Sequence, residues 1–107
     1  MSKKPESRLQ LKIRKRLEAE IGGFWFKLHT GPFQVAGIPD LIGCVGGYFV
    51  ALEVKRPGEK ASEIQDEKIQ KILQNGGATA VVTTPEEAVR YVRAAILNSL
   101  AGTGKRS

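Results

Sequence analysis

The chain is poor in the side chains that small domains use for cross-links and metal sites. Its 107 residues include one cysteine, Cys44, and one histidine, His29. A single cysteine cannot form an internal disulfide, and it cannot supply a cysteine-based zinc site. We therefore expect a cytosolic compartment, in which thiols stay reduced. Cys44 stands among apolar residues, so we expect it to be a small buried hydrophobe.

Long apolar runs are also missing. No stretch of about 18 apolar residues could span a membrane, and the N-terminal residues 1–6 lead into no apolar signal segment. We therefore expect no membrane partner. Hydrophobic residues make up 41% of the chain and charged residues 26%, as in an ordinary globular domain. A chain of this length has room for one domain with a real core.

Positive charge is concentrated at the N-terminus. The formal net charge is +6, and residues 1–16 carry all of it, with seven Lys or Arg against one acid, Glu6. The rest of the chain is balanced. A basic segment on a neutral body is typical of a protein that binds a polyanion, either nucleic acid or a membrane surface. Charge alone leaves a solvated helix face as an equally good interpretation.

Hydrophobic periodicity and turn residues predict seven elements in the order α-β-β-β-α-β-α. The expected helices span 5–21, 62–75 and 85–100. The expected strands span 24–28, 40–45, 48–55 and 78–83. The predicted fold class is therefore α/β, with a mixed central sheet flanked by helices and a C-terminal helix. Residues 1–100 would form a single domain, and residues 101–107, rich in Gly, Lys, Arg and Ser, a disordered tail.

A Gly-Gly pair at 46–47 predicts a two-residue hairpin turn between two of these strands. Counting outward from that turn places Asp40 directly opposite Glu53, with both side chains on one face of the sheet. Lys55 lies two residues beyond Glu53 and therefore shares that face. A bulge or a slip of one residue would turn Asp40 away from Glu53.

The three side chains together have the chemistry of a metal-dependent phosphodiesterase. Carboxylate oxygens are preferred ligands of Mg²⁺ and Mn²⁺. A bound divalent ion acts as a Lewis acid and lowers the pKa of a bound water, and Lys55 can help to orient the attacking hydroxide. The alternative is an exposed salt bridge between Lys55 and Asp40 or Glu53. Glu53, however, follows directly on the apolar run 48–52, where a purely structural acid would be costly.

The chain resembles the PD-(D/E)xK nucleases in Gly-Ile-Pro-Asp-Leu at 37–41, in Ala-Leu-Glu-Val-Lys at 51–55 and in Gln65 on the next helix. More narrowly, it resembles the VRR-NUC (virus-type replication-repair nuclease) family in its stand-alone phage or bacterial form, over about residues 6–96. The resemblance implies a restriction-endonuclease-like αβββαβ core. It also implies an endodeoxyribonuclease of DNA repair that depends on Mg²⁺ or Mn²⁺ and works in the cytoplasm of a bacterial host.

The resemblance assigns a role to each residue of the strand pair. Asp40 and Glu53 would be the metal-ligating carboxylates, and the backbone carbonyl of Val54 would be a further ligand. Lys55 would be the catalytic lysine.

Two helical residues complete the implied site. Glu6 would be an acid that the first helix directs at the metal, as an optional further ligand, and Gln65 would support the site from the following helix. Helical periodicity agrees, because each of the two residues falls in the apolar stripe of its helix. The alternative for Glu6 is an exposed acid in the first turn, where it favours the helix dipole.

The basic side chains of the first helix are the candidate DNA contacts. Contacts with phosphates carry no sequence information, so recognition of DNA shape is favoured over recognition of a base sequence. Lys27 and His29 share a strand face that could also point at DNA, although a polar strand-end residue is the simpler interpretation of His29. The candidate contacts on the helix are Arg8, Lys12, Lys15 and Arg16.

One active site cuts one strand, so a short chain of this kind is a candidate homodimer. Stand-alone members of the VRR-NUC family resemble Holliday-junction resolvases, whereas larger members favour flaps. The expected function is therefore that of a homodimeric endonuclease that resolves branched or four-way-junction DNA. One alternative is a monomeric flap or nicking nuclease. Another is a non-catalytic DNA-binding protein on a nuclease fold.

Overall fold

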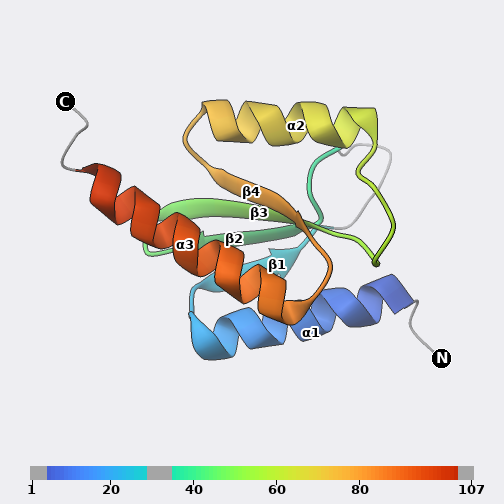
Figure 1. Ribbon diagram of the computed structural model, residues 1–107, viewed down its shortest axis with the longest axis horizontal. Helices are drawn as coiled ribbons and strands as arrows, with labels where there is room; N and C mark the ends of the chain where they lie inside the picture. The colour runs from blue at the N-terminus through green and yellow to red at the C-terminus, as the bar shows by residue number, and fades with distance from the viewer. Residues whose placement is uncertain (1–4, 29–34, 104–107) are drawn as a thin grey trace.

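The computed structural model describes residues 5–28 and 35–103, which form one four-stranded sheet and three helices (Figure 1). The elements are α1 (Pro5–Glu20), β1 (Phe24–Lys27), β2 (Leu41–Val45), β3 (Tyr48–Val54), α2 (Glu63–Gln74), β4 (Ala78–Val82) and α3 (Pro85–Thr103). Each predicted element is present in the predicted order, and the α/β fold class is confirmed. None of the described helices is long and apolar enough to cross a bilayer.

The sheet is mixed and has the strand order β1-β2-β3-β4. The first three strands pair antiparallel, and β4 runs parallel to β3. Gly46 and Gly47 both adopt positive φ, 58° and 87°, which the tight primed turns of two-residue hairpins require. Val45 therefore pairs with Tyr48, and the predicted register continues as far as the pair Leu41 and Leu52.

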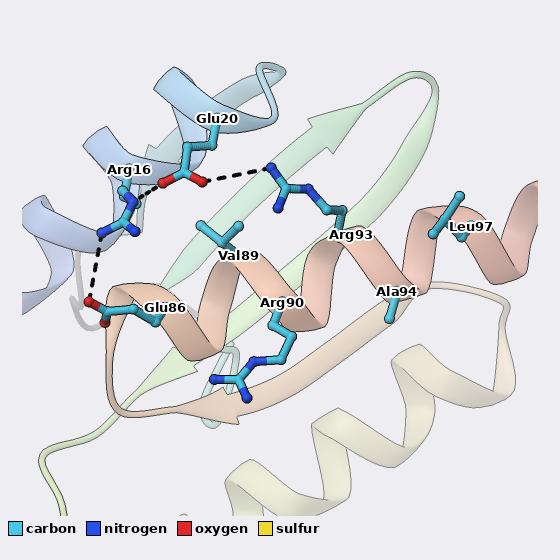
Figure 2. A pocket seen from close by; sticks show the side chains of 8 residues that line it. All are labelled: Arg16, Glu20, Glu86, Val89, Arg90, Arg93, Ala94 and Leu97. Atoms are coloured by element: carbon cyan, nitrogen blue, oxygen red, sulfur yellow. Dashed lines mark hydrogen bonds and ion pairs between the residues drawn. The ribbon is translucent and has the colours of Figure 1, made fainter.

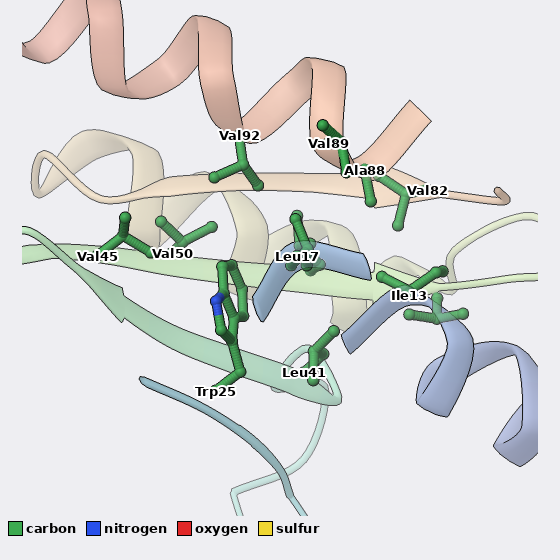
Figure 3. Close-up of a cluster of buried hydrophobic side chains, with 12 residues drawn as sticks. Ile13, Leu17, Trp25, Leu41, Val45, Val50, Val82, Ala88, Val89 and Val92 are labelled. Atoms are coloured by element: carbon green, nitrogen blue, oxygen red, sulfur yellow. The ribbon is translucent and has the colours of Figure 1, made fainter. Parts of the chain in front are cut away.

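The helices cover the two faces of the sheet unequally. α1 and α3 pack together on one face, while α2 lies on the other face beside β4 (Figure 1). The hydrophobic core fills the space between the sheet and the α1–α3 layer (Figure 3). Its buried side chains include Ile13, Leu17, Trp25, Leu41, Val50, Leu52, Val82 and Val92.

Side chains alternate along β3, and this alternation separates the core from the polar site. Val50, Leu52 and Val54 are fully buried, in the core beneath α1 and α3. Ala51 and Glu53 project from the opposite face, where α2 lies. A short strand therefore presents an apolar face to the core and an acid to the other layer.

Trp25 anchors β1 to this core. Its partner across the strand pair is Gly43, and a Cβ atom at that position would lie 2.4 Å from the indole ring. The glycine therefore leaves the space that the ring occupies. The indole Nε1 donates a hydrogen bond of 2.9 Å to the carbonyl of Gly22, so the polar atom of the buried ring is satisfied.

Two expectations were wrong. α3 continues to Thr103, so residues 101–103 belong to the helix rather than to the tail. Alanine at 101 favours the helix, and one glycine at 102 costs only about 1 kcal/mol. Residues 104–107 lie outside the described part of the chain. Cys44 is exposed rather than buried. It lies near the Gly46-Gly47 turn, at the end of β2 that is open, whereas Ile42, two residues earlier on the same face, is buried.

Candidate metal and active site

Glu53 is a buried acid near the end of β3, with 3% of its surface exposed. Its Oε2 accepts a hydrogen bond of 3.0 Å from Gln65 Nε2 and forms an ion pair of 3.4 Å with Lys55 Nζ. Its Oε1 is buried and has no hydrogen-bond partner in the structure. A buried carboxylate oxygen without a partner is costly, so this atom is open to a ligand.

Asp40 lies immediately before β2, next to the last residues of β3. Its Oδ1 accepts a hydrogen bond of 3.1 Å from the backbone N–H of Val54, and its Oδ2 accepts one of 2.8 Å from Gln10 Nε2. β2 begins at Leu41, so Asp40 lies one residue outside the strand in which it was predicted. The hydrogen bond from the Val54 N–H holds the Asp40 carboxylate close to Glu53.

Burial and mutual repulsion shift the titration of the acid pair, which we define as Asp40 and Glu53. Burial, followed by the negative charge of Asp40, raises the pKa of Glu53 to about 7, although the charge of Lys55 lowers it. Burial also raises the pKa of Asp40, against the lowering effect of the Val54 N–H. A buried acid beside a half-buried acid, both with raised pKa values, forms an environment that favours a bound cation.

Glu6 acts on the acid pair over a longer distance. It lies in the first turn of α1, half-buried, and its charge raises the pKa of both Asp40 and Glu53. Within residues 5–28 and 35–103, however, no three Asp, Glu, His or Cys side chains converge closely enough to hold a metal ion. The structure therefore brings Glu6 into electrostatic range of the acid pair without adding it to a complete set of ligands.

Gln10 belongs to the site and was not predicted from the sequence. It lies one helical turn after Glu6 in α1 and is 5% exposed. Its Nε2 donates to Asp40, and its Oε1 is buried without a partner. The available signal was its position four residues after Glu6, because a polar side chain on the inner stripe of a helix needs a partner.

Gln65 links the start of α2 to the acid pair. Its backbone N–H donates to Ser62 Oγ at 3.2 Å, and its Oε1 accepts from the Ser62 N–H at 2.8 Å, which completes the predicted capping box. Its Nε2 remains for Glu53 Oε2. The capping box therefore fixes the Gln65 side chain, whose amide donates to one oxygen of Glu53.

The candidate DNA contacts lie in different settings. Arg8, Lys12 and Lys15 are exposed along α1. Arg16 instead forms ion pairs with Glu20 and, at 3.7 Å, with Glu86 of α3 (Figure 2). Lys27 Nζ lies 3.4 Å from Ser7 Oγ, so this side chain lies against α1. His29 lies outside the described residues.

The fold is restriction-endonuclease-like, and it brings an acid pair and a lysine together at the end of β3. One similar solved structure, described as a VRR_NUC domain, is 26% identical, has a TM-score of 0.68 and matches 82% of this chain and 94% of its own. A second, described as a VRR_NUC domain protein, is 17% identical, has a TM-score of 0.69 and matches 91% of this chain and 92% of its own. No family model and no curated protein matches the chain. The chain is therefore similar to VRR_NUC domains of known structure and shares their fold.

Proposed function

We propose that the chain is a divalent-metal-dependent DNA endonuclease whose active centre is built on the acid pair and Lys55. The observation that carries this proposal is Glu53 Oε1, a buried carboxylate oxygen with no hydrogen-bond partner. Its neighbour Asp40 is a second acid with a raised pKa. Most buried polar groups in folded proteins are paired, so an unpaired carboxylate oxygen beside a second acid supports a bound ligand at this position.

A divalent cation suits the donor set around this atom. Asp40 and Glu53 would hold it, with the backbone carbonyl of Val54, and Mg²⁺ or Mn²⁺ prefers oxygen donors of this kind. When bound, the ion would polarise the phosphodiester and lower the pKa of a bound water. Glu6 would contribute negative charge from the start of α1, with which it already raises the pKa of both acids.

The protein side chains supply the remaining functions. Lys55 lies 3.4 Å from Glu53 Oε2 and is mostly buried, with 17% of its side chain exposed. It would orient the attacking water and stabilise negative charge on the phosphate. Gln65 and Gln10 each donate to one oxygen of one acid. They would hold the carboxylates in the orientation that the cation requires.

DNA is the substrate that fits the charge distribution. Arg8, Lys12 and Lys15 lie exposed on α1, the helix that also carries Gln10 of the site. Cations on such a helix bind phosphates irrespective of base sequence. We therefore propose branched DNA as the substrate class, with a four-way junction cut by a homodimer, because one active centre hydrolyses one strand at a time.

A cleavage assay tests this function directly. Labelled duplex, flap, splayed-arm and four-way-junction DNA are incubated with the chain in Mg²⁺, in Mn²⁺ and in EDTA, beside Asp40→Asn and the control Glu63→Gln, which changes an exposed acid on α2. We expect metal-dependent cleavage, strongest on the junction, that Asp40→Asn abolishes and Glu63→Gln retains. Turnover by Asp40→Asn, or unchanged turnover in EDTA, would refute the proposal. Preference for a flap would replace the junction as substrate.

A further inference from the structure

An apolar row crosses three strands on the face of the sheet opposite α1 and α3. Phe24 pairs with Cys44, and Cys44 pairs with Phe49, so the three side chains lie side by side. Phe26 extends the row along β1, with its ring centroid 5.6 Å from that of Phe24. We call Phe24, Phe26, Cys44 and Phe49 the sheet-face patch.

The sheet-face patch is open to solvent. Phe24 is 68% exposed, Phe49 48% and Phe26 38%, and Cys44 is also exposed. α2 lies beside β4 at the other edge of the sheet (Figure 1). The patch residues therefore stay open, although Ile42, two residues before Cys44 on the same face of β2, is buried. A strand with one solvated face usually alternates apolar and polar side chains, yet β1 places phenylalanine on the open side at both positions.

Charge distinguishes the ligands that such a surface could take. The patch contains no cation, since Lys27 of β1 contacts Ser7 of α1. Lys71, at the border of the patch, is paired with Glu67 at 3.4 Å. Surfaces that stack unpaired bases combine aromatic rings with cations that follow the phosphates. An aromatic patch without cations therefore favours a protein partner over nucleic acid.

We propose that the sheet-face patch is the surface through which two copies of the chain associate. This inference rests on the proposed function, since a junction nuclease needs a second active centre. The three rings leave roughly 300 Å² exposed, which suits the central cluster of an interface of about 800 Å² per partner. In a two-fold dimer the patch faces its own copy, so an uncharged surface meets an uncharged surface.

A hollow next to the patch could receive a side chain of the second copy. It has a volume of 330 Å³ and is lined by Phe49, Lys71, Ile72, Asn75 and Gly77. Two-fold symmetry makes every contact reciprocal. A ring of one copy that enters the hollow of the second is thus matched by the same contact in reverse.

Two charge-introducing substitutions test the surface. Phe24→Glu places a carboxylate in the patch, and Leu97→Glu places one at a comparably exposed position on α3, 63% against 68%. Sedimentation equilibrium should give the wild-type chain and Leu97→Glu twice the monomer mass of 11.7 kDa. Dimerisation of Phe24→Glu should weaken by about 30-fold or more. A monomeric wild-type chain, or equal dimerisation of all three proteins, would overturn the proposal.

The single cysteine gives a second readout that needs no substitution. Maleimide labelling reports on Cys44 alone, because the chain has one cysteine. We expect labelling to slow as the protein concentration rises through the dimerisation range, without DNA. A dimer whose Cys44 stays fully reactive would show that a different surface associates. Protection that requires single-stranded DNA at monomer concentrations would assign the patch to nucleic acid instead.

The outcomes separate this inference from the proposed function. A chain that dimerises through the patch but cleaves no DNA in Mg²⁺ or Mn²⁺ would refute the nuclease and retain the surface. A monomer that cleaves DNA would retain the nuclease and refute the surface.

Discussion

Two clusters of acidic and basic side chains in this molecule differ in burial and in charge balance. The ion-pair network of Arg16, Glu20, Glu86 and Arg93 bridges α1 and α3 at the surface (Figure 2), with each acid beside an arginine. The site of Asp40, Glu53 and Lys55 is largely buried, and it has two acids for one lysine. Exposed pairs contribute little to stability, whereas buried unbalanced charge is costly. This imbalance is why we propose the buried cluster, and not the surface network, as the active centre.

The largest difference is expected in catalysis. Lys55→Ala should lower the rate of metal-dependent DNA cleavage by about 100- to 1000-fold, the usual effect of removing one group that stabilises developing charge. Lys60→Ala, which removes an exposed lysine before α2, is the matched control and should keep wild-type activity. Single-turnover cleavage measures both, with circular dichroism as the check on folding. Equal cleavage rates for the two variants would show that Lys55 is not part of the active centre.

The next effect concerns stability without metal. The pKa of Glu53 is raised from 4.5 to about 7, so the folded protein holds this proton more tightly than the unfolded chain does. The contribution of protonated Glu53 to the free energy of unfolding is fully present below pH 4.5 and is lost as the pH rises through about 7. In EDTA, the free energy of unfolding should fall by about 3 kcal/mol over that window.

Urea denaturation at pH 5 and pH 8 measures this effect. Other groups also titrate between these values, so the decisive quantity is the difference between the wild type and Glu53→Gln. The variant carries no charge at this position at either pH and should lose much less stability. Millimolar Mg²⁺ at pH 8 should restore stability to the wild type, because the ion binds the folded state. Parallel pH profiles of the two proteins without metal would contradict the raised pKa.

Metal affinity should depend on Gln10. Gln10→Leu removes the amide that donates to Asp40 Oδ2 and should weaken binding of Mg²⁺ or Mn²⁺ by about 10- to 100-fold, as is usual for partners that orient metal ligands. Gln70→Leu, an exposed position on α2, is the control. Isothermal titration calorimetry with the metal alone gives the affinities. An unchanged affinity in Gln10→Leu would show that Asp40 needs no such support.

The buried cluster was partly predictable because local signals determine part of it. The two glycines at 46–47 dictate the hairpin register, and alternation along β3 then places Glu53 and Lys55 on one face. The capping box at Ser62 likewise located the start of α2 and thereby Gln65. These features depend on residues close together in the chain.

Other features depend on how distant elements pack. Gln10 meets Asp40 across 30 positions, and nothing near Gln10 in the chain indicates its partner. Cys44 is exposed while Ile42, on the same face of β2, is buried, although the apolar neighbours of Cys44 suggested burial. Periodicity predicts that a side chain leaves a strand face, but only the tertiary arrangement decides whether anything covers it.

The smallest effect is expected in the surface network. Glu20→Gln disrupts the ion pairs with Arg16 and Arg93, whose side chains are 43% and 57% exposed. Exposed pairs contribute at most about 1 kcal/mol each, so the midpoint of urea unfolding should move little. Metal-dependent cleavage should stay within about twofold of the wild type, because no residue of the network contacts the acid pair. If Glu20→Gln lost as much cleavage as Lys55→Ala, solvent exposure would not distinguish the catalytic cluster from the surface network.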